Sequence, residues 1–173
     1  MKSKENGFTL IGLVVALTIS AIIAAGAGMT TAQIMEGSRS NNDRTTAVRQ
    51  AQNVGYWVSR DALTTQAIVT TDNLETPEIE FIIAYWKDWE TGDTHDIRYT
   101  LFDSADSLKR LERNQLSRDK DGVITDNNTT QVADNILAAN ITQQGDTWIL
   151  YIEARSGEKS VTREYEFSLR HTL

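Results

Sequence analysis

Residues 7–18, GFTLIGLVVALT, are the stretch that decides how this chain folds. They follow a short charged leader, MKSKEN, and they open a run from residue 6 to residue 35 that carries no charged side chain. The most apolar part of this run is residues 8–29. As a helix it would measure roughly 33 Å at about 1.5 Å per residue, which matches the hydrocarbon core of a bilayer. The sequence therefore predicts a membrane-spanning helix close to the N-terminus.

Three interpretations of this apolar segment are open. A secretory signal peptide has a basic start, an apolar segment of roughly 7–15 residues and a cleavage site of small residues. The apolar segment here is longer than that, although residues 24–28, AAGAG, resemble such a cleavage site. An ordinary membrane anchor is the second interpretation. The third depends on the residues around Gly7.

Gly7 stands directly before Phe8-Thr9-Leu10-Ile11 and after a lysine-containing leader. This arrangement resembles the prepilin signal of type IV pilins and type II secretion pseudopilins. The resemblance implies that a membrane peptidase cleaves after Gly7 on the cytoplasmic side and that the new amine of Phe8 is then methylated. It also implies that the apolar helix is retained and becomes the core of a filament. The expected membrane and core residues are Phe8, Leu10, Ile11, Leu13, Val14, Val15, Leu17, Ile19, Ile22 and Ile23.

Physical chemistry fits each part of this signal. Gly7 has no side chain, so a peptidase can hold the backbone closely. Lys2 and Lys4 keep the leader in the cytoplasm by the positive-inside rule. A continuous helix satisfies its own backbone groups in lipid, and the same apolar surface can later be buried against identical neighbours. Lipid contact alone would require the same apolar residues.

Gly12 is a departure from the family pattern. Most members carry a glutamate at this position, the fifth of the mature chain. In the family that carboxylate is thought to pair with the free N-terminal amine of a neighbouring subunit inside the filament core, where an unpaired amine is costly. Members at the filament tip sometimes lack it. Gly12 therefore indicates either a subunit near the tip or a substitution that is simply tolerated.

Composition predicts one modest domain in addition to the long helix. The chain has 173 residues, no cysteine and a net charge of −7. Lys2, Lys4 and Glu5 make the leader +1, which leaves −8 for the rest. Such an acidic domain repels nucleic acid phosphates, so no nucleic acid partner is expected. The expected division is a leader at 1–7, a transmembrane or filament-core helix at 8–35 and an extracytoplasmic pilin-like domain at 36–173.

A helical period returns after residue 43. Val48, Ala51, Val54 and Val58 recur at spacings of three and four residues, whereas Asp61 and other charged residues are expected on other faces. One helix is therefore predicted from residue 8 to about residue 65, with its second half on a sheet. Tyr56 and Trp57 are expected in the core. Three glycines, Gly26, Gly28 and Gly37, are poor interior helix residues, so any bend is expected at them.

Strand patterns occupy most of the remaining sequence. Residues 66–77 read as a connection, residues 117–131 as a polar loop, and residues 132–137 as a short turn or helix. The strands are expected at 78–86, 96–102, 107–116, from 140–142, 147–154 and 160–169. The order is one long helix followed by an antiparallel meander of about six strands, an α+β layout. With its loose spacings of Ile97–Leu101, Leu108–Leu111 and a C-terminal YEFSLR, the chain is similar to the J-type minor pseudopilins of type II secretion.

No catalytic constellation is visible, so an enzyme is not expected, and neither is a cofactor. Asp119, Asp121 and Asp126 lie in a polar segment that has the oxygen ligands calcium prefers, but the spacing does not fit an EF-hand, and a solvated turn is the simpler interpretation. His95 and His171 have no partner at metal-ligand spacing. Trp86 is expected in the core, and Trp89 is the better candidate for an exposed contact.

The sequence thus favours a minor pilin or pseudopilin that sits as a single-pass protein in the cytoplasmic membrane and then enters an extracytoplasmic filament. Its expected partners are other pilin or pseudopilin subunits, a prepilin peptidase, and the membrane with its assembly platform. The alternative is a membrane-anchored sensor or binding module with an extracytoplasmic β-domain.

Overall fold

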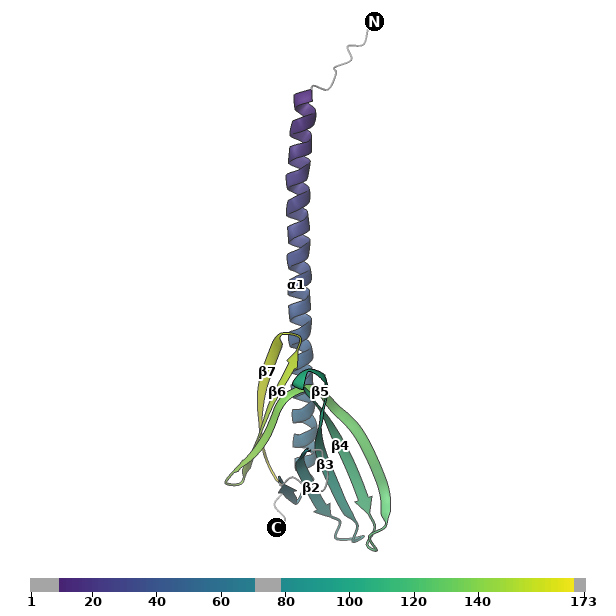
Figure 1. The fold of residues 1–173 in the computed structure, drawn as a ribbon. Coiled ribbons are helices and arrows are strands. Elements are labelled where there is room, and N and C mark those ends of the chain that lie inside the picture. Colours follow the sequence, from purple (N-terminus) through teal and green to yellow (C-terminus); the bar gives the residue numbers. More distant parts are fainter. Residues whose placement is uncertain (1–9, 71–78, 170–173) are drawn as a thin grey trace. The chain divides into compact units, whose positions relative to one another are not determined.

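The computed structural model describes residues 10–70 and 79–169. The chain divides into two units, residues 1–41 and residues 42–173. One long α-helix, α1 (Leu10–Ala62), is followed by the strands of one antiparallel sheet (Figure 1), and a short 3-10 helix, η1 (Ala105–Ser107), lies between the third and fourth strands. The strands are β1 (Ala67–Val69), β2 (Ile79–Lys87), β3 (Thr94–Asp103), β4 (Lys109–Arg118), β5 (Ile124–Gln144), β6 (Thr147–Ser156) and β7 (Lys159–Ser168).

Helix α1 has 53 residues and runs without a break through all three of its weak glycines. It ends at Ala62, three residues before the predicted limit. Its second half packs one face onto the sheet, as the spacing of apolar residues predicts. The buried residues of this face are Ala47, Ala51, Val54, Gly55, Val58, Asp61 and Ala62. The α+β layout of a long N-terminal helix and an antiparallel sheet is confirmed.

The sheet has the simplest possible order, β1 to β7, with each strand paired to its neighbour in sequence. All pairs are antiparallel, from Ala67 opposite Tyr85 at one edge to Ser156 opposite Lys159 at the other. The strands predicted at β2, β3, β4, β6 and β7 are therefore found. The short edge strand β1 lies where the sequence predicted only a connection, and residues 71–78 of that connection lie outside the described residues.

Strand β5 corrects two predictions. Residues 124–131 were expected in a loop and residues 132–137 in a turn or helix, yet all belong to one strand of 21 residues. Residues 124–129 are exposed throughout, so they lack the alternation of buried and exposed side chains that identifies a strand. The amide of Asn114 on β4 holds this polar part by donating to Asn127 Oδ1 at 2.9 Å and to Thr129 Oγ1 at 2.8 Å.

Strand β5 also changes partners along its length. It pairs with β4 up to Ile136 and with β6 from Ile136 onward. Asn135 has a positive φ of 60°, and the register shifts on both sides of this point. An irregularity of this kind bends and twists a strand, which allows one strand to serve two groups of neighbours.

The core lies between the second half of α1 and the sheet. Its largest fully buried side chains include Tyr99, Ile82, Ile97, Leu111, Ile136, Leu150 and Ile152. Trp57 and Trp86 pack against this core from partly buried positions. Tyr56, which was expected in the core, is instead 60% exposed.

A buried ion pair fixes the last turn of α1 to the sheet. Arg113 on β4 donates to Asp61 through Nε, 2.6 Å from Oδ2, and through Nη2, 3.2 Å from Oδ1. The hydroxyl of Tyr99 on β3 donates to the same Oδ2 at 2.5 Å. Burial, together with the neighbouring Asp61 carboxylate, raises the pKa of Tyr99, so its phenol remains a donor.

We expect Asp61→Ala to lower the free energy of unfolding by about 3–5 kcal/mol, because it leaves the Arg113 guanidinium buried without its carboxylate. Asp103→Ala is the matched control, since it breaks the exposed Lys109–Asp103 pair and should cost less than about 1 kcal/mol. Urea unfolding of the full chain in detergent, followed by tryptophan fluorescence, measures both. Equal losses for the two variants would contradict this role of Asp61.

Candidate functional site

The first half of α1 presents apolar side chains on every side. No charged residue occurs between Leu10 and Met35, and the first is Glu36. Leu10 is 79% exposed and Ile22 is 72% exposed, and the other large apolar residues of this segment are more than 45% exposed. They are Ile11, Leu13, Val14, Val15, Leu17, Ile19, Ile23, Met29, Ile34 and Met35. A helix that is apolar all round needs a surrounding other than water.

Three threonine hydroxyls within this segment are satisfied by the helix itself. The hydroxyl of Thr18 donates to the carbonyl of Val15 at 2.8 Å. Those of Thr30 and Thr31 donate to the carbonyls one turn earlier, each at 2.9 Å. These hydroxyls therefore need no water, which is the condition for placing them in lipid or in a protein core. By length and composition, α1 is able to cross a membrane.

The structure places most of the residues predicted from the sequence in this segment on one helix. Leu10 to Ile23 of the predicted set all lie on α1, and Gly12 is a half-exposed helical residue. Gly7, at the predicted cleavage point, and Phe8 lie outside the described residues.

The acidic residues considered for calcium form a turn and a strand. Asp119 Oδ1 accepts from the backbone N–H of Asp121 at 2.9 Å and of Val123 at 2.8 Å, so this carboxylate holds its own turn. Asp126 lies on β5 opposite Ser117. Within the ranges that the structure describes, no three His, Asp or Glu side chains are grouped so as to hold a metal ion.

His95 takes part in the packing of the sheet. Its ring stacks on Trp86 with 4.7 Å between centroids, and its Nδ1 lies 2.9 Å from Ser117 Oγ. His171, the other histidine, lies outside the described residues.

Comparison with known proteins gives one finding. Residues 2–28 match the prokaryotic N-terminal methylation motif, a range that includes Gly7, Phe8 and the start of α1. No match was found among curated proteins or among solved structures. The motif supports a type IV pilin-like protein that is processed by a prepilin peptidase. Together, the motif and the apolar helix indicate membrane anchoring.

We expect the double variant Leu17→Arg, Ile19→Arg to lose stable membrane insertion. Each arginine near the centre of a membrane helix costs about 2.5–3.5 kcal/mol. The control carries Gln33→Arg and Ser38→Arg, which lie close to the charged end of the helix and should remain inserted. The fraction of each protein that resists carbonate extraction from membranes measures the effect. Retention of the central double variant at the wild-type level would contradict the assignment of this segment to the membrane.

Proposed function

We propose that this chain is a minor pilin or pseudopilin, a structural subunit of a type IV pilus-like or type II secretion filament. The observation that carries the proposal is the methylation motif at residues 2–28, which includes the start of an apolar helix that its own fold leaves exposed. An α+β domain that follows this helix is the arrangement expected of such a subunit.

The helix works in two successive environments. In the cytoplasmic membrane, lipid covers the side chains from Leu10 to Met35, with the leader in the cytoplasm and the β-domain outside. In the filament, the same side chains are covered by the helices of other subunits. Complete burial of one large apolar side chain is more favourable than its exposure to water by about 1.5–3 kcal/mol. Subunits that leave the lipid must therefore pack their helices closely against one another. An assembly platform would move them between the two environments.

Gly12 is the basis for placing the subunit near the filament tip. It lies in the third helical position of the described chain, so a side chain at this point would project from α1 close to the new N-terminus. Gly12 has no carboxylate to offer the amine of a neighbouring subunit. A subunit of this kind is best suited to a position at the tip, and the J-type minor pseudopilins are the proposed subtype.

Coexpression with a prepilin peptidase should remove seven residues and leave Phe8 as a methylated N-terminus. Gly7→Leu should block the cleavage, because the peptidase then meets a side chain where it requires bare backbone. Asn6→Ala, one residue earlier, is the matched control and should be cleaved normally. Intact-mass measurement of the purified proteins gives the result. Removal of a longer segment that ends near Ala27, or an intact N-terminus in the presence of active peptidase, would refute the proposal.

Introducing a carboxylate at position 12 tests the proposed place at the tip. Gly12→Glu should increase the number of copies per filament and place some of them along the shaft, because the variant can now neutralise a neighbour's amine. Gly12→Gln controls for the added bulk without the charge. Immunogold labelling and quantitative blotting of sheared filaments count the copies. If number and position are unchanged for Gly12→Glu, the tip assignment is wrong.

A further inference from the structure

Three large apolar side chains are exposed at one end of the sheet. Trp89, in the turn between β2 and β3, is 78% exposed. Val123 and Ile124, at the start of β5, are 60% and 56% exposed. The turns that hold them are neighbours, because a Cβ added to Gly92 would lie 3.4 Å from the Cβ of Lys120. The apolar side chains therefore belong to one end of the domain.

Residues 88–93 and 119–124, which we together call the turn surface, have a backbone that is fixed by hydrogen bonds. Asp88 Oδ1 accepts from the N–H of Glu90 at 2.8 Å and of Thr91 at 3.4 Å. Asp119 holds the other turn in the same way, through the N–H groups of the residues two and four positions later. Little further ordering of these turns is needed when a partner binds, which favours binding.

The turn surface lies outside the core of its own domain. The last turn of α1 meets β3 at Tyr99, where the phenol donates to Asp61. From Tyr99, β3 continues back to Thr94 before it reaches the turn that carries Trp89. Figure 1 shows the β2–β3 and β4–β5 turns at the same end of the sheet. The described part of the chain thus leaves this apolar surface to water.

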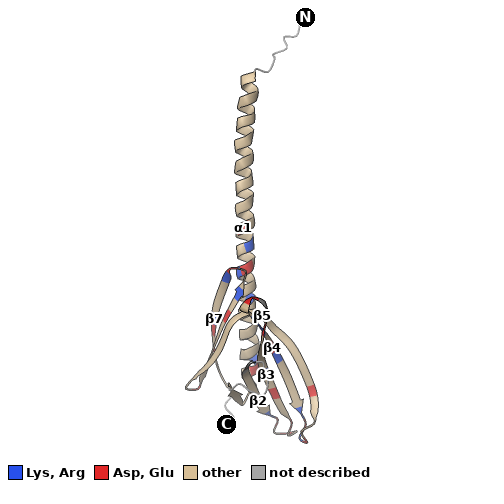
Figure 2. Cartoon of the chain, in the orientation of Figure 1, with Lys and Arg blue, Asp and Glu red and all other residues tan. Residues whose placement is uncertain are grey.

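The turn surface has an acidic border. Residues 87–93 and 118–126 carry six carboxylates against three cationic side chains (Figure 2). One of these cations is already engaged, because Arg118 Nη1 donates to Asp96 Oδ2 at 2.5 Å. The backbone N–H groups next to Asp88 lower the pKa of its carboxyl group, so this group stays charged near neutral pH. The six carboxylates are those of Asp88, Glu90, Asp93, Asp119, Asp121 and Asp126.

The sign of this charge selects the occupant. The phosphates of anionic lipids and nucleic acids, and the same acidic end of a second copy, would be repelled. A cationic side chain is attracted both to the carboxylates and to the face of the exposed Trp89 indole. Arginine suits both contacts, because its planar guanidinium is weakly hydrated, stacks on aromatic rings and pairs with carboxylates.

We propose that the turn surface binds a separate protein through a segment in which arginine side chains alternate with apolar ones. An arginine of this segment stacks on Trp89 and pairs with Glu90, and its apolar side chains cover Val123 and Ile124. The contact uses no residue of the apolar half of α1, so it goes beyond the proposed filament function. One copy of the chain is sufficient for it, which agrees with a place at the filament tip.

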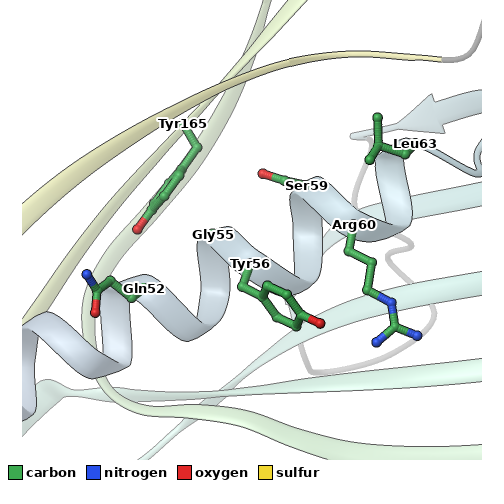
Figure 3. A pocket seen from close by; sticks show the side chains of 7 residues that line it. All are labelled: Gln52, Gly55, Tyr56, Ser59, Arg60, Leu63 and Tyr165. Atoms are coloured by element: carbon green, nitrogen blue, oxygen red, sulfur yellow. The ribbon is translucent and has the colours of Figure 1, made fainter.

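A second apolar surface of the domain provides the matched control. It is an open groove of about 670 Å³ along α1, lined by Tyr56, Arg60 and Tyr165 among others (Figure 3). Its charges are mixed, because the exposed Glu164 and Glu166 flank Tyr165 on β7. Tyr56 is 60% exposed and therefore serves as an exposed aromatic residue outside the turn surface.

The test uses the full chain in phosphatidylcholine nanodiscs and a short fluorescent peptide in which arginine alternates with leucine. Fluorescence anisotropy gives the Kd, and empty nanodiscs give the background. We expect saturable binding, and we expect that replacing every arginine by citrulline, its uncharged analogue, weakens this binding strongly. Equal binding of the two peptides, or no binding of the arginine peptide above background, overturns the proposal.

Single variants locate the contact. Trp89→Ala should raise the Kd about tenfold, as expected for the loss of a tryptophan anchor, whereas Tyr56→Ala should leave it unchanged. If Tyr56→Ala weakens binding and Trp89→Ala does not, the peptide binds in the groove and the proposal is wrong.

Double variants identify the charges. Glu90→Lys combined with Asp121→Lys should weaken binding, because it reverses two charges at the turn surface. Glu164→Lys combined with Glu166→Lys changes the net charge by the same amount on β7 and should have little effect. Equal losses in the two double variants would mean a general attraction to an acidic protein, which contradicts a specific contact.

Vesicles of phosphatidylglycerol test lipid as the occupant. They should not bind the protein through the turn surface, and flotation of the nanodiscs with such vesicles measures this. Flotation that Trp89→Ala abolishes would assign the surface to lipid and overturn the proposal. None of these measurements requires cleavage or filament assembly. A negative result therefore leaves the pilin assignment intact, and a failure of cleavage leaves this proposal unaffected.

Discussion

The 26 residues from Leu10 to Met35 contain no charged side chain, and the rest of the structure depends on keeping this segment out of water. A helix satisfies the backbone of such a segment from within, and three threonines hydrogen-bond to its own carbonyls. What remains is apolar surface on all sides, which only lipid or other protein can cover. The methylation motif at residues 2–28 covers the first part of this segment.

The second half of the same helix packs against the sheet, and both apolar contacts and an ion pair hold it there. Small buried residues such as Ala47, Ala51 and Gly55 let it lie close to the sheet. At its end, Asp61 receives hydrogen bonds from both Arg113 and Tyr99, so three elements meet at one carboxylate. Apolar packing alone is non-directional, whereas this ion pair requires one rotation and one position of the last helical turn. An open groove of about 670 Å³ lies along this half of α1, where Gly55 meets the Tyr165 ring of β7 (Figure 3).

Most elements could be predicted from sequence because their patterns are local. The apolar run and the three- and four-residue spacing of Val54 and Val58 identified the helix. Alternation, enrichment in β-branched and aromatic residues, and the position of β4 after the first arm of a hairpin identified five of the strands. Strand β1 was missed because it is only three residues long, and the start of β5 was missed because both of its faces are exposed. Asp61 was expected outside, although it lies seven residues after Val54 and so on the buried face. The prediction gave more weight to the charge of Asp61 than to its position in the helical repeat. No local sequence pattern identifies its partner, Arg113, which lies 52 residues away. Among the candidate site residues, the exposure of Trp89 was anticipated, whereas the groove depends on Tyr165 meeting Gly55 across more than a hundred residues.

The order of the strands has a consequence for how the domain is completed. Each strand pairs with the one that precedes it in sequence, so the sheet can grow one hairpin at a time as the chain emerges, without waiting for distant segments. Contacts with α1 are long-range, and the last of them is made by β7, which brings Tyr165 back to Gly55, a helical residue 110 positions earlier. The side of α1 at Ala51 and Gly55 is thus the last to be covered, and a subunit whose synthesis stops short of β7 would have a nearly whole sheet but would lack the Tyr165 ring on this side of the helix.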